Sequence, residues 1–520
     1  MRRIYGQPLA ILLLAALAAV AAGCGGGDDG GMVPAPPVTP APPVSGPAWP
    51  AFGRDVQHTA VSGIATQPLG RILWQTPVDL APQYASGQYL LTHYGSPVIS
   101  SMNTVLVPVK TAANGSFRFE ARSGANGAQI WSANSDYIVP PHNWFPSFNV
   151  TLAGGRVYAP GAGGKVYYRD NVDSATGAVQ TAVFYGANVY NGAKAELDAA
   201  VMISTPLTID AAGNVYFGFF VTGSNSAGLS SGIARLAADG TGSWRPAAMV
   251  SNDNAMDRLA MNSAPALSSD GATLYFAVSN AAGQGYLVAV NSTTLAPVAR
   301  VALTDPSTGT PARITGDATA SPTIGPDGDV YFGVLEAVSR AHNGRGWLLH
   351  FNAALTQQRI PGAFGWDDTA SIVPATAVPS YTGTSSYLLA VKYNDYAGAG
   401  TGTGQNRMAI IDPSRSQPDP ISSVATMAEV MTVLAPTPDP DHPGGVKEWC
   451  VNTAAVDVAT RSILVNNEDG QIYRWDLVTG RLSEQLRFNN GLGESYTPTA
   501  VGADGTVYAI NNGQLFAVGR

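Results

Sequence analysis

A short phrase recurs along the 520-residue chain, and it limits the possible fold more than any other feature. Each copy opens with a short apolar strand led by a small residue and proline, continues through a glycine-containing turn, and ends in an aromatic strand. The openings are SPVIS (96–100), TPLTI (205–209), APALS (264–268), SPTIG (321–325), VPAT (373–376) and TPTAV (497–501). The aromatic strands are RVYAP (156–160), NVYFG (214–218), TLYFA (273–277), DVYFG (329–333), QIYRW (471–475) and TVYAI (506–510). Such strands, joined by Asx-Gly or Gly-Gly turns, are typical of β-hairpins.

One copy alone cannot bury enough surface to fold, because three or four short strands have only one apolar face. The copies lie roughly 50 residues apart, and this period predicts an all-β chain built as a β-propeller. Seven complete blades are expected, at 95–131, 148–183, 203–244, 262–301, 318–358, 369–413 and 448–485.

The C-terminal strands, from Tyr496 to Val518, form an eighth blade that lacks its outer strand. A lone strand near the other end of the chain, Arg71 to Thr76, has no hairpin partner in the sequence. Joining the two closes the ring and leaves no open sheet edge. We therefore predict eight four-stranded blades, with an N-terminal strand completing the last one; seven blades are the alternative.

The composition agrees with β structure and excludes some partners. Charged residues are only 12% of the chain, whereas glycine is abundant (58 residues) and apolar residues reach 45%, which excludes a disordered chain. The formal net charge is −8 and the pI is about 5.2. A nucleic acid partner is excluded, because no basic surface is available to neutralise phosphates.

The first 23 residues have the pattern of an export signal. Arg2 and Arg3 precede an apolar run from Leu9 to Ala22, which is short for a membrane span. Residues 24–46 are rich in glycine and proline, which predicts a flexible and then extended linker. The chain is thus expected to comprise a signal peptide (1–23), a linker (24–46) and a folded body (47–520).

The end of the signal, Ala21-Ala22-Gly23-Cys24, resembles a bacterial lipobox, with Ala21 where leucine is usual. The resemblance implies that Cys24 is lipidated and becomes the first residue of a lipoprotein anchored in the cell envelope. Because Gly25 follows the cysteine, the same resemblance implies the outer membrane. A plain signal peptide cut near Ala22 is the alternative.

Two further phrases resemble the PQQ-type, quinoprotein alcohol dehydrogenase-like propellers. WPAFGRDVQHTAVSG (49–63) is similar to the opening of that family, with Ala60 in place of the usual glycine. ARSGANGAQIW (121–131), DSATGAVQT (173–181) and WDLVTGRL (475–482) are similar to its docking motif, in which a tryptophan packs between blades. The second copy has Thr181 at the tryptophan position, and the third has Glu484 beyond its end.

Candidate site residues lie in the loops that lead into the last three blades, because propellers place functional groups around the central channel. They are Asp367 and Asp368 in GWDDTAS, Glu448 in KEWCVN, and Glu494 and Tyr496 in ESY. If they converge, they would bind a hard cation or a small polar ligand; which metal, if any, is left open. The alternative is that each group only satisfies loop backbone.

The resemblance also implies PQQ stacked on a tryptophan and covered by a disulfide of adjacent cysteines, with calcium beside a catalytic aspartate. Cys450 is the one cysteine of the body, so that disulfide is impossible, and a haem-type CxxCH is absent. We therefore predict a non-catalytic envelope lipoprotein that binds or scaffolds protein partners, akin to the propeller lipoprotein of the outer-membrane assembly machinery. The insertion 398–446 is its expected contact surface. A PQQ- and calcium-dependent periplasmic dehydrogenase, or a carbohydrate- or peptide-binding propeller using Trp144, Trp366 and Trp449, are the alternatives.

Overall fold

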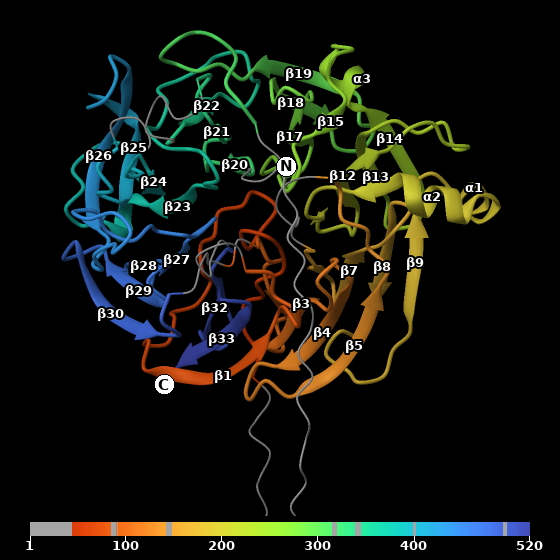
Figure 1. Cartoon of the computed structure of the whole chain (residues 1–520), viewed down its shortest axis with the longest axis horizontal. Coiled ribbons are helices and arrows are strands. Elements are labelled where there is room, and N and C mark those ends of the chain that lie inside the picture. Colours follow the sequence, from red (N-terminus) through yellow and green to blue (C-terminus); the bar gives the residue numbers. More distant parts are fainter. Residues whose placement is uncertain are drawn as a thin grey trace, which may run out of the picture. The chain divides into compact units, whose positions relative to one another are not determined.

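The computed structural model describes residues 44–84, 90, 92–141, 148–314, 320–338, 345–398, 402–491 and 497–520. Residues Val44–Arg520 form one compact unit. This unit is an eight-bladed β-propeller, in which eight antiparallel sheets follow one another around a ring (Figure 1). The predicted fold class and the count of eight are confirmed. The predicted signal peptide and Cys24 lie outside the described residues.

Blades 1 to 4 follow one another in sequence. Their strands are β2 (Val98–Ile99), β3 (Thr104–Lys110), β4 (Phe117–Ser123) and β5 (Gln129–Ser135); β6 (Thr151–Ala153), β7 (Arg156–Pro160), β8 (Lys165–Arg169) and β9 (Val179–Val183); β10 (Val201–Ile203), β11 (Thr208–Ile209), β12 (Val215–Val221), β13 (Gly232–Leu236) and β14 (Gly242–Pro246); and β15 (Arg258–Leu259), β16 (Ala266–Leu267), β17 (Thr273–Ser279), β18 (Gly285–Asn291) and β19 (Pro297–Ala302).

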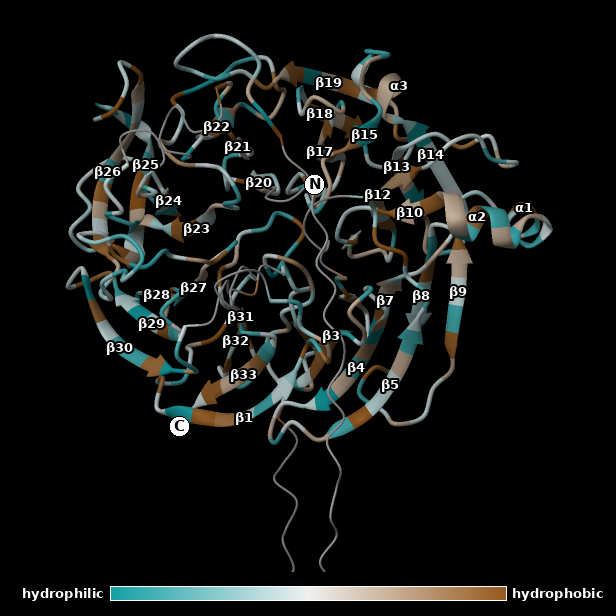
Figure 2. Cartoon of the chain, in the orientation of Figure 1, coloured by the Kyte–Doolittle hydropathy of each residue, from teal (hydrophilic) through white to brown (hydrophobic). Residues whose placement is uncertain are grey.

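Blades 5 to 8 complete the ring. Their strands are β20 (Thr323–Ile324), β21 (Val330–Val334) and β22 (Trp347–Phe351); β23 (Ser371–Pro374), β24 (Tyr387–Tyr393), β25 (Arg407–Pro418) and β26 (Ala425–Leu434); β27 (Ala455–Asp457), β28 (Ser462–Asn467), β29 (Gln471–Asp476) and β30 (Arg481–Arg487); and β31 (Ala500–Val501), β32 (Val507–Asn511), β33 (Gln514–Gly519) and β1 (Arg71–Pro77). Middle strands such as β28 are fully buried, whereas the outer strand β30 alternates exposed and half-buried residues. Figure 2 shows both hydrophilic and hydrophobic residues on β30.

Short helices occur only in connections of the described chain. They are α1 (Ala187–Gly192), α2 (Lys194–Ala200), α3 (Ala247–Ser251) and the 3-10 turn Ala375–Ala377. None of the helices within the described ranges is long and apolar enough to cross a membrane.

The two ends of the body meet in blade 8. β1 pairs antiparallel with β33, from Arg71 opposite Gly519 to Pro77 opposite Gln514. The predicted closure by an N-terminal strand is therefore confirmed. Before the chain reaches β1, its residues 46–67 contact the inner strands of other blades.

Residues 46–67, which we term the belt, bond to the inner part of one blade after another. Backbone hydrogen bonds join the belt to seven blades through residues 99, 152, 267, 324, 372, 456 and 505. His58 lies within the belt and is buried, and its Nδ1 lies 2.7 Å from the Pro322 carbonyl oxygen. Burial lowers the pKa of His58 to about 4, so it is neutral at physiological pH. Residues 49–63, which resemble the opening of the quinoprotein-like family, thus connect the blades by hydrogen bonds.

The conformation of the belt explains why the resembled family usually has glycine at the position of Ala60. Ala60 has φ of 56°, in the left-handed region that glycine adopts without steric cost. Its amide and carbonyl bond to the Gly53 oxygen and the Val456 amide, so this conformation is fixed on both sides.

Small polar residues at the blade openings have a structural role between blades. Hydroxyl groups of the inner strands donate to backbone carbonyl oxygens of the next blade. These bonds run from Thr151 to Leu207, Thr208 to Pro265, Ser263 to Ala320, Thr323 to Ala370 and Ser371 to Ala454, at 2.5–2.9 Å. These five hydroxyl groups are therefore satisfied by the protein itself, and each bond joins one blade to the next.

The structure differs from the predicted strand register in two blades. The inner strand of blade 6 begins at Ser371, so VPAT (373–376) is its end and not its opening. QIYRW (471–475) lies in β29, the third strand of blade 7. A five-residue pattern does not specify which strand of a blade carries it.

The predicted insertion 398–446 also belongs largely to the sheet. β25 and β26 are the third and fourth strands of blade 6 and lie on the outer side of the ring (Figure 1). The described part of blade 5 has only three strands, and Gly362 exchanges two backbone hydrogen bonds with Leu348 where a fourth would pair. The β25–β26 hairpin of blade 6 packs against this outer edge of blade 5, because the Met427 amide of β26 donates to the Pro361 carbonyl at 2.8 Å.

Trp74 of β1 should carry much of the closure energy. Its side chain is 8% exposed, and its Nε1 donates to the Gly124 carbonyl of blade 1 at 2.8 Å. We expect Trp74→Ala to lower the free energy of unfolding by about 3–5 kcal/mol, the usual cost of truncating a buried tryptophan. Chemical denaturation of the full chain measures this, with the exposed Leu80→Ala as the matched control. If both substitutions lower the free energy of unfolding by the same small amount, the proposed contribution of Trp74 to ring closure is contradicted.

Candidate functional site

The two adjacent aspartates lie in a tight turn that leads into β23. The Asp368 amide donates to the Gly365 carbonyl, and Asp367 has φ of 58°, which aspartate tolerates better than most residues. In an extended strand the two carboxylates would point to opposite sides. Because Asp367 is in the left-handed region, both carboxylates instead face Lys392 of the neighbouring strand β24.

Lys392 is the centre of this cluster. Its side chain is 1% exposed, and its Nζ lies 2.7 Å from Oδ1 of Asp367. Burial disfavours the ammonium form, but the charges of Asp367 and Cys450 outweigh this cost and raise the pKa of Lys392. A buried lysine must be paired, and Lys392 forms an ion pair with Asp367. Removing either partner would leave an uncompensated buried charge and would strongly destabilise the fold.

Asp368 has a different electrostatic role from its neighbour. It is 3% exposed, and its Oδ2 accepts a long hydrogen bond, 3.4 Å, from the Lys392 amide. Burial raises the pKa of Asp368 well above its usual value; Lys392 opposes this shift and Asp367 adds to it. Lys392 therefore faces two carboxyl groups: it is paired with Asp367, and the raised pKa of Asp368 favours the protonated form of that group.

Aromatic side chains cover the ion pair. The rings of Trp366 and Tyr396 meet edge to face at a centroid distance of 5.8 Å. Burial raises the pKa of Tyr396 well above 10, and Asp367 and Glu448 contribute to the rise. The indole N–H of Trp366 is buried and has no acceptor within the described residues.

Side-chain amides fix the surrounding loops. Asn394 is fully buried and exchanges hydrogen bonds with the Trp449 backbone, at 3.1 and 3.2 Å. Asn452 donates to the Asp367 carbonyl at 3.2 Å, and its own carbonyl accepts from the Thr369 amide. The loops that lead into blades 6 and 7 are thereby held as one rigid unit.

The predicted residues are brought together only in part. Asp367, Asp368 and Glu448 lie around Lys392 and Tyr396, and Glu448 is half-buried. Glu494, Tyr496 and Trp144 lie outside the described residues. Trp449 is fully buried in the core between blades 6 and 7, so it is not the exposed loop aromatic that was expected.

From the sequence, Lys392-Tyr393-Asn394-Asp395 is a further candidate that we interpret as a strand end and turn, so the place of Lys392 and Asn394 in this cluster is not predicted. Both occur in YLLAVKYN (387–394), where a lysine ends an otherwise apolar strand. A lone charge in a strand that is apolar on both faces signals a buried partner, because such a charge is seldom left unpaired.

The family resemblance implies PQQ and calcium, and the residues present do not fit them. The ammonium of Lys392 already neutralises Asp367, so a divalent cation beside it would meet a like charge. Across the described ranges, no group of three or more His, Cys, Asp and Glu side chains is arranged to hold a metal ion. Cys450 is buried and forms no disulfide.

Comparisons with known proteins support the fold. No protein-family model matches the chain, and no curated protein matches it. Among solved structures, it is similar to a europium-containing methanol dehydrogenase, with a TM-score of 0.55 and 10% identity over 89% of this chain and 88% of that one. It is also similar to a quinohemoprotein alcohol dehydrogenase from Comamonas testosteroni, with a TM-score of 0.55 and 11% identity over 91% and 81%.

A second quinohemoprotein alcohol dehydrogenase, from Pseudomonas putida HK5, matches with a TM-score of 0.54 and 12% identity over 91% of this chain and 76% of that one. Together these structures show that the chain has the quinoprotein alcohol dehydrogenase-like propeller fold, as its opening phrase and docking motifs indicated. At such low identity the likeness concerns the fold alone.

The raised pKa of Asp368 predicts an unusual pH dependence of stability. Because its folded pKa is raised, the folded chain keeps a proton that the unfolded chain releases above about pH 4, so this group destabilises the fold as pH rises. Asp368→Asn removes that penalty. We expect the variant to gain stability over the wild type by about 1.4 kcal/mol per pH unit from pH 4 up to the folded pKa.

Denaturant unfolding at pH 4, 6 and 8 measures the difference. Asp367→Asn is the matched control, and it should destabilise the chain at every pH because Lys392 loses its carboxylate partner. Parallel stability curves for Asp368→Asn and the wild type would contradict a protonated Asp368.

Proposed function

We propose that the protein is a non-catalytic binding propeller of the bacterial cell envelope, which scaffolds protein partners. The observation that carries this proposal is the buried ion pair of Lys392 and Asp367, at 2.7 Å. It pairs Asp367, one of the two adjacent candidate carboxylates, with an ammonium, while burial favours the protonated form of Asp368. A rigid, internally neutral site is suited to structural support and to weak polar contacts, not to proton abstraction.

Catalysis by a buried carboxylate needs a base that is ionised at the working pH. Burial raises the pKa of Asp368 and so favours its neutral form, and Asp367 is paired with Lys392. Cys450 cannot supply the adjacent-cysteine disulfide that the family resemblance implies over a quinone. These three features favour binding over the alternative of a PQQ- and calcium-dependent dehydrogenase.

The β25–β26 hairpin is the surface we assign to a protein partner. Two points of the hairpin are fixed, because Arg345 pairs with the buried Asp419 of its connecting turn at 3.1 Å and the Tyr381 hydroxyl donates to Asp412 of β25 at 2.7 Å. Between these two points, residues 414–416 are exposed. A rigid hairpin with an exposed, polar and positively charged edge at Arg415 suits an acidic partner surface.

The proposal also places the body in the envelope through its N-terminus. Lipidation of Cys24 would anchor the chain, and the linker 24–46 would hold the propeller away from the outer membrane. This part rests on the sequence pattern of residues 1–46. Mass spectrometry of the N-terminal peptide from membranes tests it directly.

The test of function uses the full-length chain purified in detergent. With calcium and PQQ added, we expect no quinone absorption band from bound cofactor, no dye reduction with alcohols, and a shift in melting temperature of less than about 1 °C. A bound quinone band with dye reduction and a raised melting temperature would contradict the proposal and support a dehydrogenase.

The binding role is tested with charge-reversed variants and cross-linking in intact cell envelopes. Arg415→Glu on the hairpin should reduce cross-linking to its main partner about tenfold or more, since it places like charges at the interface. Arg481→Glu, on the outer strand β30 of blade 7, is the matched control and should leave the cross-link unchanged. Equal yields from both variants would refute the hairpin as the contact surface.

A further inference from the structure

Outer-strand tryptophans join blades at two successive junctions. Trp74 of blade 8 reaches the last turn of blade 1, where a Cβ added to Gly127 would lie 2.8 Å from its ring. Trp131 of blade 1 reaches the last turn of blade 2, and its Nε1 donates to the Val172 carbonyl at 2.7 Å. The Arg169 guanidinium lies 4.1 Å from the Trp131 ring centroid. In both cases an indole fills the space between an outer strand and the next blade.

The next junction lacks this indole. Thr181 of β9 stands four residues after Gly177, as Trp131 stands four residues after Gly127. It faces the last turn of blade 3, which holds Gly240 with φ of 87°. A Cβ added to Gly240 would meet no atom within 4 Å, whereas the equivalent Gly127 is covered by Trp74.

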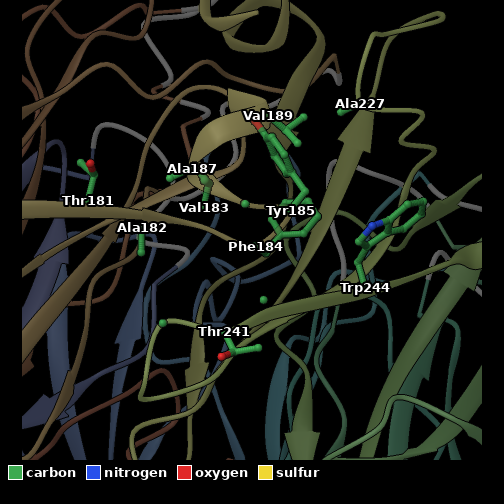
Figure 3. Close-up of a pocket in the computed structure, with 13 residues that line it drawn as sticks. Thr181, Ala182, Val183, Phe184, Tyr185, Ala187, Val189, Ala227, Thr241 and Trp244 are labelled. Carbon is green, nitrogen blue, oxygen red and sulfur yellow. The ribbon is translucent and has the colours of Figure 1, made fainter. Parts of the chain in front are cut away.

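A cleft of about 620 Å³ occupies this junction. Figure 3 shows Tyr185 and Val189 on one side of it and Trp244 on the other, with Thr181 and Thr241 also at its border. Its inner end is closed where Gly242 meets the Phe184 backbone. Each of its thirteen lining residues is uncharged, so the cleft suits a neutral and largely apolar group.

We propose that this cleft is a docking site for a tryptophan side chain of a partner protein. The occupant follows from the two neighbouring junctions, where an indole fills the same place and donates its N–H to a backbone carbonyl of the adjoining turn. Tyr185 and Trp244 supply aromatic walls, against which a planar ring packs edge to face or offset. The turn of residues 237–241 supplies backbone carbonyl groups for the indole N–H.

This inference rests on the proposed binding role and names the side chain that a partner would present. The cleft lies between blades 2 and 3, whereas the β25–β26 hairpin belongs to blade 6. The two surfaces can therefore be tested separately, because a substitution in one leaves the other unchanged.

The probe is N-acetyl-tryptophanamide, and binding to the full-length chain is measured by saturation-transfer NMR. We expect a Kd in the millimolar range, on the order of what one buried side chain provides. N-acetyl-leucinamide is the control probe and should bind at least about tenfold more weakly, because it has no indole N–H and no planar ring. Equal signals from the two probes, or no saturation transfer to the tryptophan probe, would overturn the proposal.

Thr181→Trp gives the sharper test. The new indole should fill the cleft from within, abolish binding of the probe, and raise Tm by about 1–3 °C. Val298→Trp, at an exposed position on the outer strand β19, is the matched control and should change neither quantity. Trp244→Ala, which removes one wall without filling the cleft, should weaken probe binding at least about threefold.

Unchanged probe binding in Thr181→Trp would overturn the cleft as the docking site. If probe binding fails while cross-linking still depends on Arg415, only the tryptophan site is wrong. If PQQ binds and dye is reduced, the proposed binding role itself is wrong, whatever the probe does.

Discussion

A ring of sheets is stable only when its first and last blades are joined, and the pairing of β1 with β33 makes that join. The belt strengthens the same closure, because residues 46–67 bond to seven blades before the chain reaches β1. Loss of either contact exposes two blade faces and the inner ends of several strands. The N-terminal part of the body therefore stabilises the whole propeller, although it contributes only one strand to a sheet.

Near the channel the blades meet through polar atoms, and each such atom needs a partner to be buried at low cost. Hydroxyl groups of Thr208, Thr323 and Ser371 find carbonyl oxygens in the next blade. The buried ammonium of Lys392 likewise needs a partner, and it pairs with the carboxylate of Asp367. The ion pair therefore joins the turn before β23 to β24 within blade 6, and it commits the charge of Asp367 to Lys392 rather than to a cation or a base role.

Much of the fold could be predicted from the sequence, because turn residues and period-two strands recur at a constant spacing. Closure by Arg71–Pro77 could be predicted because one strand lacked a partner. β26 could not, because its residues show no copy of the repeated phrase. Asp367 and Asp368 stood out as adjacent acids, whereas Lys392 was interpreted as part of a strand end and turn, because its pairing depends on how β24 is aligned with the turn before β23.

The account depends most on the state of the carboxylates around Lys392. A crystal structure of the full-length chain grown with calcium and PQQ would show that state directly. We predict that Nζ of Lys392 stays within hydrogen-bonding distance of Asp367 and that no metal ion lies between the two aspartates. A calcium ion coordinated by Asp367 or Asp368, with Lys392 displaced, would contradict the account and indicate a quinone-dependent enzyme.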